Sequence, residues 1–362
     1  MKALFIIPYP TEGPSNRYRV EQFLPYLKEK GIEYTVRPFV SSEFFRIIYK
    51  KGNTLRKIRF FLSATCNRMV DLLSASKYDL IFIHIESFPF GPAIMELAFS
   101  LLKKPIVYDF EDAVYLDNFK GQSRLINLLR YQRKFYQILG LSSHVIVCNR
   151  YMKDMVSEFN NNVTVIPTSI DTEKFKAKDY AVQAKRPVIG WIGSHTTLYC
   201  LKSLVGVFTE LAKRYDFELR VIGGGEDFAV PGVNVVNKRW SLETDVKDFQ
   251  SLDIGVYPLP NDERAVAKTP FKTIQYMSVG VPPIVSKVGG NIDIIEEGKN
   301  GFFASNEKEW IDKLSILIEN AQLRRDIGLA GRRTVEEKFS VSANAPKFID
   351  IVTQVYGKRR NL

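Results

Sequence analysis

The sequence predicts an α/β protein of two doubly wound domains, each a mostly parallel β-sheet with helices on both faces. Short apolar, β-branched segments alternate with segments of helical period, and the pattern starts again after a polar stretch that ends near residue 186. Buried strands that alternate with helices are typical of parallel sheets, because each parallel connection crosses over through a helix. A chain of 362 residues is also long enough for two domains.

The first domain is expected to span residues 1–170. A helix after its first strand should bury one face and end at Gly31. The apolar positions of that helix are Val20, Phe23, Leu24 and Leu27. The expected strands are KALFIIP (2–8), EYTVRPF (33–39), DLIFIHIE (79–86), PIVYDF (105–110), HVIVCN (144–149) and VTVIP (163–167).

The second domain is expected to span residues 187–338, after a polar linker at 171–186. The last segment, 339–362, has a helical period, and we expect it to pack back on the first domain. The expected strands of the second domain are VIGWIG (188–193), ELRVIGGG (218–225), VNVV (233–236), DIGVYPL (253–259) and PPIVS (282–286).

The charge and the cysteines limit the function classes. The formal charge is +11, and residues 1–180 hold 26 basic and 18 acidic residues, so the first half is suited to an anionic partner. The three cysteines show no CxxC spacing, which disfavours a disulfide framework and a zinc site, so no metal is expected. No stretch reaches the ~20 apolar residues of a membrane span, and the apolar start MKALFIIPYP is too short for a signal peptide. We therefore expect a protein of the reducing cytoplasm.

Loops that follow strands carry the candidate site residues of the first domain, because open α/β sheets bind ligands at the carboxyl ends of their strands. Gly13 allows close approach of a ligand, and Arg19 supplies positive charge for an anion. A plain turn with solvated arginines remains an alternative. Asp109 and Glu111 crowd negative charge at another strand end, which favours a polar substrate site over a simple helix cap.

His84 is expected to share one face of its strand with Glu86, because side chains alternate along a strand. An active-site role and a hydrogen-bonded core histidine are both open for His84.

The loop and helix around residues 268–280 are the most informative part of the second domain. Thr269 is expected to cap a helix whose first position is Pro270, and Gly280 should end it. Lys268 and Lys272 then flank a helix start whose dipole favours anions, as a diphosphate site requires. A capped surface helix with two solvated lysines is the alternative.

Three further positions could contribute to a nucleotide site in the second domain. Gly193 and Ser194 lie where a strand opens toward a helix, although the surrounding GWIG is neither a dinucleotide fingerprint nor a P-loop. Gln275 could hydrogen-bond a ribose. Trp240 could lie near the base, or simply in the core.

Four segments together resemble the GT-B glycosyltransferases, specifically the retaining family 4. They are GPSNRYR (13–19), YDFEDAVY (108–115), VIPTSID (165–171) and KTPFKTIQYMSVGVPPIVSKVGGNIDIIEEGKNGF (268–302). The resemblance implies a GT-B fold in which two Rossmann-like domains face each other across a cleft. It also implies a nucleotide-sugar donor and transfer with retention of anomeric configuration, without a metal or any other cofactor.

The resemblance also implies roles for single residues. Gly13 would approach the donor diphosphate from the first domain, while Lys268 and the amides after Thr269, including that of Phe271, would hold it from the second. Lys272 or Arg19 would help to neutralise the phosphates. Asp109 or Glu111 would orient the acceptor hydroxyl or the sugar, with His84 as an outer candidate.

One departure from the family concerns a pair of glutamates with seven residues between them, which hold the sugar and the ribose in many relatives. Gln275 aligns with the second glutamate and Ala267 with the first, so Glu263 or Asp262 would have to replace the missing carboxylate.

The segment 44–62 carries six basic and no acidic residues among apolar ones. Basic amphipathic helices suit an anionic bilayer, where each cation contributes roughly 1 kcal/mol near the surface. A packed helical hairpin is the alternative, and a nucleic-acid partner is not expected because no nucleic-acid-binding motif accompanies the charge.

We expect a retaining glycosyltransferase that moves a sugar from a UDP-sugar or GDP-sugar to a lipid-linked or polysaccharide acceptor in cell-envelope glycan synthesis. It would be cytoplasmic and peripheral on the inner face of the plasma membrane. The alternative hypotheses are that the protein is a GT-B nucleotide-sugar epimerase, or a non-catalytic nucleotide-sugar-binding or membrane adaptor protein.

Overall fold

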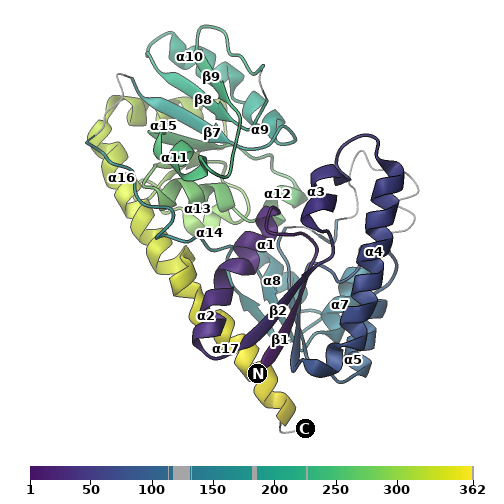
Figure 1. The fold of residues 1–362 in the computed structure, drawn as a ribbon. Helices are drawn as coiled ribbons and strands as arrows, with labels where there is room; N and C mark the ends of the chain where they lie inside the picture. The colour runs from purple at the N-terminus through teal and green to yellow at the C-terminus, as the bar shows by residue number, and fades with distance from the viewer. Residues whose placement is uncertain (113, 117–130, 132, 182–185, 226, 361–362) are drawn as a thin grey trace. The chain divides into compact units, whose positions relative to one another are not determined.

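The computed structural model describes residues 1–112, 114–116, 131, 133–181, 186–225 and 227–360. The chain divides into two compact units. Unit 1 comprises Met1–Ser169 together with Asn344–Leu362, and unit 2 comprises Ile170–Ala343. Both units are α/β (Figure 1), as the sequence predicts.

The sheet of unit 1 has six parallel strands in the order β2-β1-β3-β4-β5-β6. Each strand lies within one of the apolar segments that predict it. β1 and β3 are almost completely buried because helices cover both faces. The order reverses between β1 and β3, which is where open sheets of this kind bind ligands. The strands are β1 (Lys2–Ile7), β2 (Glu33–Pro38), β3 (Leu80–His84), β4 (Ile106–Asp109), β5 (His144–Val147) and β6 (Val163–Val165).

Helices cover both faces of this sheet. On one face α5 contacts both α4 and α7 (Figure 1), and on the other Phe23, which precedes α2, stacks on Phe348. The predicted first helix is confirmed in its buried positions but is divided into short pieces before Gly31. The helices are α1 (Pro14–Arg19), η1 (Glu21–Phe23), α2 (Leu24–Glu29), α3 (Ser42–Ile48), α4 (Thr54–Leu73), η2 (Ala75–Lys77), α5 (Ile94–Leu101), α7 (Lys134–Leu141) and α8 (Arg150–Val156).

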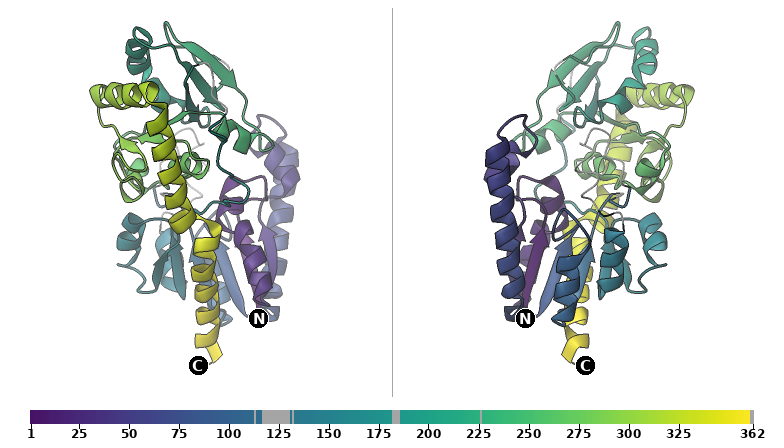
Figure 2. Two further views of the ribbon diagram at one scale, coloured as in Figure 1. Left: turned by 90° about the vertical axis from the view of Figure 1, so that its left-hand side faces the viewer. Right: turned by 90° about the vertical axis from the view of Figure 1, so that its right-hand side faces the viewer.

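The last helix, α17 (Val341–Arg360), packs on unit 1, as the sequence predicts. Phe348 stacks on Phe23 at 4.7 Å between ring centroids and lies 5.4 Å from the ring of Phe82 in β3. The start of β1 and the end of α17 lie at the same end of unit 1 (Figure 2), away from the carboxyl ends of the strands.

The sheet of unit 2 also has six parallel strands, in the order β12-β11-β10-β7-β8-β9. Its order reverses between β7 and β10, and the strand β12 has no counterpart among the predicted strands. The strands are β7 (Val188–Ile192), β8 (Glu218–Ile222), β9 (Asn234–Lys238), β10 (Ile254–Tyr257), β11 (Pro283–Val285) and β12 (Phe302–Phe303).

Two apolar clusters fill the faces of this second sheet. One joins α10 and α15 to the sheet through Phe208, Leu314 and Trp191, and the other joins α11 and α13 to it through Phe249 and Tyr276. The helices are α9 (Leu198–Lys202), α10 (Val205–Ala212), α11 (Asp245–Gln250), α12 (Glu263–Ala267), α13 (Phe271–Ser278), α14 (Asn291–Ile294), α15 (Glu307–Glu319), α16 (Ala321–Thr334) and the π-helical turn η3 (Val335–Phe339).

The segment expected to be a linker makes its described contacts inside unit 2. The Lys178 amide bonds to the Val279 carbonyl at 2.9 Å, and the Lys178 ammonium pairs with Asp253 at 2.8 Å. The Tyr180 hydroxyl donates to the Gly280 carbonyl at 2.6 Å. Residues 182–185 of this segment lie outside the described residues. The polar composition at 171–181 therefore reflects a strap tied to the surface of unit 2.

Tyr276 holds α13 on the sheet of unit 2. Its buried hydroxyl accepts the Ile192 amide at 3.1 Å, at the end of β7. Tyr276→Phe leaves that amide without its partner, so we expect the free energy of unfolding of unit 2 to fall by about 1–3 kcal/mol.

Tryptophan fluorescence in urea measures this loss directly, because all three tryptophans, Trp191, Trp240 and Trp310, belong to unit 2. Tyr215→Phe removes a surface hydroxyl that bonds Glu319 and serves as the control, with a change within about 0.5 kcal/mol. An equal effect of the two variants would show that the Tyr276 hydroxyl does not anchor α13.

Candidate functional site

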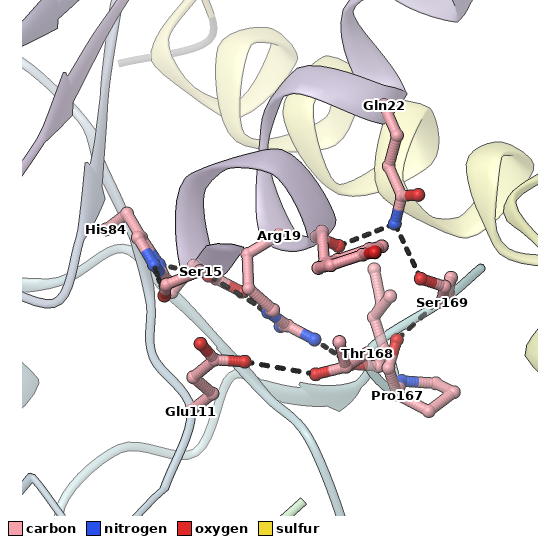
Figure 3. A network of polar contacts seen from close by, with 11 residues as sticks. Ser15, Arg19, Gln22, His84, Glu111, Pro167, Thr168 and Ser169 are labelled. Carbon is pink, nitrogen blue, oxygen red and sulfur yellow. Dashed lines mark hydrogen bonds and ion pairs between the residues drawn. The ribbon is translucent and has the colours of Figure 1, made fainter. Parts of the chain in front are cut away.

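Helix α1 and the ends of β3 and β4 place four polar side chains of unit 1 in one network, of which Figure 3 labels Ser15, Arg19 and His84. Arg19, on α1, forms an ion pair with Asp109 at the end of β4 through two hydrogen bonds. Asp109 Oδ2 also lies 2.7 Å from His84 Nδ1, and His84 Nε2 lies 2.6 Å from the Ser15 hydroxyl. The register of β3 and β4 sets His84 opposite Asp109. The topology therefore assembles a chain of four hydrogen-bonded groups at the predicted edge.

Burial makes this network electrostatically sensitive. Arg19, His84 and Asp109 are at most 2% exposed. Burial alone would raise the pKa of Asp109, but the Arg19 guanidinium and His84 hold it below its usual value. Burial would likewise lower the pKa of Arg19, whereas Asp109 raises it above its usual value. Both groups are therefore charged at neutral pH.

The charge of Asp109 fixes the tautomer of His84. An ionised carboxylate only accepts hydrogen bonds, so Nδ1 of His84 donates to Asp109. In the neutral ring Nε2 is then the acceptor, and the Ser15 hydroxyl donates to it. Ser15 is half-buried, so this chain of hydrogen bonds leads from the interior toward the surface.

Two expectations for this region need correction. Arg19 is buried and already paired with Asp109, so it is not available to neutralise a donor diphosphate. Both carboxylate oxygens of Asp109 already accept hydrogen bonds from Arg19 and His84, so Asp109 is suited to positioning His84 rather than to orienting an acceptor. Removing the Asp109 charge alone would leave Arg19 buried without its partner, which costs about 3–5 kcal/mol.

Glu111 is a partly accessible carboxylate of the acidic segment, in which Asp112 is exposed. It is partly buried, and its Oε2 accepts from the Thr168 hydroxyl at 3.2 Å (Figure 3). Thr168 belongs to the segment after β6, where Arg19 also bonds the Ile166 carbonyl at 2.7 Å. The segments 108–115 and 165–171, which carry the family resemblance, thus meet in space.

His84 and Glu86 do not share one face as predicted. β3 ends at His84, and Ile85 adopts a φ of 63°, which turns the chain and breaks the alternation. Glu86 instead pairs with Lys134 at 3.0 Å. A β-branched residue at positive φ is strained, and here it is held by bonds from its amide to the Asp109 carbonyl and from the Tyr108 hydroxyl to its own carbonyl.

Gly13 lies where the loop after β1 packs closely. A side chain at this position would place its Cβ only 2.7 Å from the Cβ of Tyr9. Gly13 directly precedes α1, so the glycine allows the tight turn that brings Ser15 and Arg19 to the network. This packing explains the glycine without a ligand.

In unit 2 Lys268 lies in the turn between α12 and α13, which follow β10, one of the two strands between which the sheet order reverses. Gly289 and Gly290 pack against this turn, where a Cβ would lie 2.6 Å from the Ala265 carbonyl and 2.7 Å from Pro270, respectively. The predicted cap is wrong by one residue, since α13 begins at Phe271 and Pro270, not Thr269, occupies the cap position without a side-chain bond. Gly280 ends the helix at a φ of 76°, as predicted.

Lys272 lies one turn beyond Lys268 and is held by two neighbours, Gln275 and Phe249. Its ammonium donates to Gln275 Oε1 at 2.9 Å and lies 5.4 Å from the centre of the Phe249 ring. Loss of hydration lowers the pKa of Lys272 to about 8, with Asp245 opposing and Lys268 adding to this effect. The structure therefore brings together Lys268, Lys272 and Gln275 as predicted, but Gln275 already binds Lys272.

Gly193 and Ser194 use their backbone amides within the protein. The Gly193 amide donates to the Ile222 carbonyl at 3.0 Å, and the Ser194 amide donates to the Thr197 hydroxyl at 3.2 Å. These two amides therefore do not form the open anion site that the sequence suggests. Gly193 is needed because a Cβ there would meet the Trp191 ring at 2.3 Å.

Trp240 and the acidic residues of the next loops complete this edge of unit 2. Trp240 is 42% exposed, and its indole donates to Asp245 at 2.7 Å, so its ring has a fixed orientation beside the surface. Asp262 caps α12 by accepting the Ala265 amide at 2.8 Å, and both Asp262 and Glu263 are exposed. Ala267, which aligns with the first glutamate of many relatives, is buried.

Sequence reasoning missed two participants. Ser15 and Thr168 were not singled out, because their partners His84 and Glu111 lie far away in sequence. Among the described residues, no group of three or more His, Cys, Asp or Glu side chains is arranged to hold a metal ion.

Family models match both units. Residues 18–174 match the model described as Glycosyltransferase Family 4, and residues 186–320 match the model described as Glycosyl transferases group 1. These two matches cover nearly all of the segments that carry the candidate site.

Curated relatives match at low identity. Spore coat protein SA of Bacillus subtilis is 32% identical over 96 residues, which is 25% of this chain and 24% of the relative. The capsular polysaccharide biosynthesis glycosyltransferase CapM of Staphylococcus aureus is 25% identical over 194 residues, which is 50% of each chain. The matched stretches thus span between a quarter and half of the length of these relatives.

A solved structure shares the fold over the whole chain. Anabaena HepE in complex with UDP-glucose superposes with a TM-score of 0.67 at 15% identity, covering 98% of this chain and 100% of that one. The family matches and this likeness agree with the sheet orders of the two units. The chain belongs to the GT-B glycosyltransferases of the family 4 type.

Proposed function

We propose that the protein transfers a sugar from a UDP-sugar or GDP-sugar to a lipid-linked or polysaccharide acceptor, with retention of anomeric configuration and without a metal. We assign the donor to unit 2 and the acceptor to unit 1. The names of two similar proteins support the substrate classes, since HepE is described with UDP-glucose and CapM with capsular polysaccharide biosynthesis.

The observation that carries the proposal is the pair of cations at the start of α13. Lys268 and Lys272 lie at the switch point of a doubly wound sheet, where ligands bind. Lys272 is partly buried, so its ammonium group is poorly hydrated. The negative charge of a bound diphosphate would compensate for this lost hydration. A cation kept there at the cost of a lowered pKa is suited to an anionic ligand.

These cations also suit the chemistry of transfer. Breaking the anomeric bond places negative charge on the leaving diphosphate. Cations fixed in advance at that position stabilise the transition state more than the ground state, which raises the rate of the chemical step. Lys268 and Lys272 are the residues to which we assign this role.

Glu111 and His84 are the groups that we assign to the acceptor. Glu111 is accessible and held by Thr168, so it can accept a hydrogen bond from an acceptor hydroxyl. His84 has its tautomer set by Asp109, and the Ser15 hydroxyl links it toward the surface. Asp109 acts here as a positioning residue.

A thermal-shift screen against UDP-, GDP-, dTDP- and ADP-sugars tests the proposal, because a ligand that binds only the native state raises its melting temperature. A shift with a UDP- or GDP-sugar and release of nucleotide in the presence of an acceptor fit a transferase. Conversion of the sugar without an acceptor would indicate an epimerase, and binding without turnover an adaptor protein.

Lys268→Ala should weaken binding of UDP or GDP by about tenfold or more, because one cation–phosphate contact is worth roughly 1.5–3 kcal/mol. Isothermal calorimetry measures the affinity. Lys299→Ala, at an exposed lysine of the same unit that pairs with Glu296, is the matched control and should bind as the wild type does. Equal affinities of all three proteins would remove Lys268 from the site.

UDP binding should take up protons near and above pH 8. In the free protein the pKa of Lys272 is about 8, so part of this side chain is neutral there. A bound diphosphate favours the ammonium and raises that pKa, so affinity should fall as the pH rises further.

Calorimetry in two buffers of different ionisation enthalpy measures the proton uptake. Lys272→Arg keeps its charge over this range and should abolish the uptake. Undiminished uptake in the arginine variant would assign the proton to another group.

Glu111→Gln should lower kcat by roughly a hundredfold with little change in nucleotide affinity, because the substitution removes a base in unit 1 and leaves the donor residues of unit 2 intact. Glu158→Gln, at an exposed position of unit 1, is the control. A wild-type kcat in the Glu111 variant would contradict this role.

A further inference from the structure

An apolar stripe runs along the solvent-facing side of α4. Leu55, Ile58, Leu62, Met69 and Leu73 are 84%, 51%, 59%, 43% and 82% exposed. Their steps of three, four, seven and four residues place them on one side of an α-helix. Single exposed apolar residues are ordinary, but a continuous stripe of this length is typical of a docking surface.

The opposite side of α4 is already packed on unit 1. Ala64 lies in a cluster with Phe39 and Phe44, against which Phe60 and Phe61 also pack. Farther along, Arg68 and Asp71 form a buried ion pair at 3.0 Å. The stability of unit 1 is therefore served by the inner face, and the outer stripe has no role in its core.

α5 extends the apolar surface beside α4. The two helices are in contact, as Figure 1 shows from their positions. Ile94, Leu97 and Leu101 of α5 are 63%, 46% and 76% exposed. Two neighbouring helices thus both carry apolar side chains into solvent.

Positive charge surrounds the first half of the stripe. Residues 44–62 contain six basic and no acidic side chains. Five of the basic side chains are exposed, and Tyr49, at the turn between α3 and α4, is 73% exposed. The exposed cations are Arg46, Lys50, Lys51, Arg56 and Arg59. Apolar side chains flanked by cations and an aromatic residue match the interface of an anionic bilayer.

We propose that the outer face of α4, continued by α5, docks on an anionic lipid bilayer. The apolar stripe would lie at the boundary of the acyl chains, and the flanking cations would lie at the lipid phosphates. Charge favours this occupant over a second copy of the chain, because two copies would bring the same basic surfaces together. None of the helices in the described part of the chain is long and apolar enough to cross a bilayer. The inference deepens the proposed function, on whose lipid-linked acceptor it rests.

Sedimentation with vesicles of phosphatidylcholine and phosphatidylglycerol tests the docking face. Wild-type protein should bind these vesicles, bind less at high salt, and bind poorly to phosphatidylcholine alone. Leu55→Gln, Ile58→Gln and Leu62→Gln combined keep helix propensity and should lower the affinity at least about tenfold. Lys50→Gln, Lys51→Gln and Arg56→Gln combined should lower it on the order of a hundredfold.

The matched control is Ile292→Gln with Ile316→Gln, at exposed apolar positions of unit 2 with exposed fractions of 52% and 41%. It should bind vesicles as the wild type does. An environment-sensitive fluorophore on Cys66, which is exposed on α4 within the stripe, should shift to the blue with anionic vesicles.

The nucleotide thermal shift of each variant separates this proposal from the proposed function. Unchanged nucleotide binding with lost vesicle binding supports the docking face. Vesicle binding without any nucleotide binding overturns the proposed function and leaves the docking face standing. If the stripe variant binds vesicles as strongly as the wild type does, the docking face is overturned. The docking face is also overturned if the wild-type protein binds no vesicles but is a dimer, and the stripe variant is a monomer.

Discussion

The shared direction of the strands is the constraint on which both units depend. In a parallel sheet all loops that follow strands gather at one edge, so residues far apart in sequence meet there without a dedicated scaffold. Unit 1 uses this edge to join the loops after β1, β3, β4 and β6. Unit 2 uses it to anchor α13, the helix that carries Lys272, at the end of β7 through Tyr276.

The two edges use charge in opposite ways. In unit 1 the guanidinium of Arg19 forms a buried ion pair with Asp109. The ionised Asp109 then holds His84 in one tautomer. In unit 2 the loss of hydration at Lys272 outweighs the attraction of Asp245, and the pKa of Lys272 falls to about 8. A network that satisfies its own charges positions a side chain, whereas one that leaves cations under-compensated is suited to an anionic ligand.

The strands of both sheets were predictable because buried parallel strands leave short apolar runs in the sequence, and only the two-residue β12 escaped. The cations of α13 were also predictable, since a proline, a threonine and a glycine mark that helix. Pairing was not predictable. Nothing local shows that Arg19 faces Asp109 ninety residues away, or that Ile85 turns the chain and separates His84 from Glu86. The sequence also does not show which backbone amides already have hydrogen-bond acceptors. The amides of Gly193 and Ser194 were therefore predicted to be available to an anion, but each donates to another group of the protein.

Hydrogen–deuterium exchange with and without UDP tests the central claim most directly, because it locates nucleotide binding on the chain without assuming a substrate. The account predicts that UDP slows exchange in peptides covering residues 263–278 of unit 2. Protection confined to peptides of unit 1, or no protection at a saturating concentration, would contradict the assignment of the diphosphate to the start of α13.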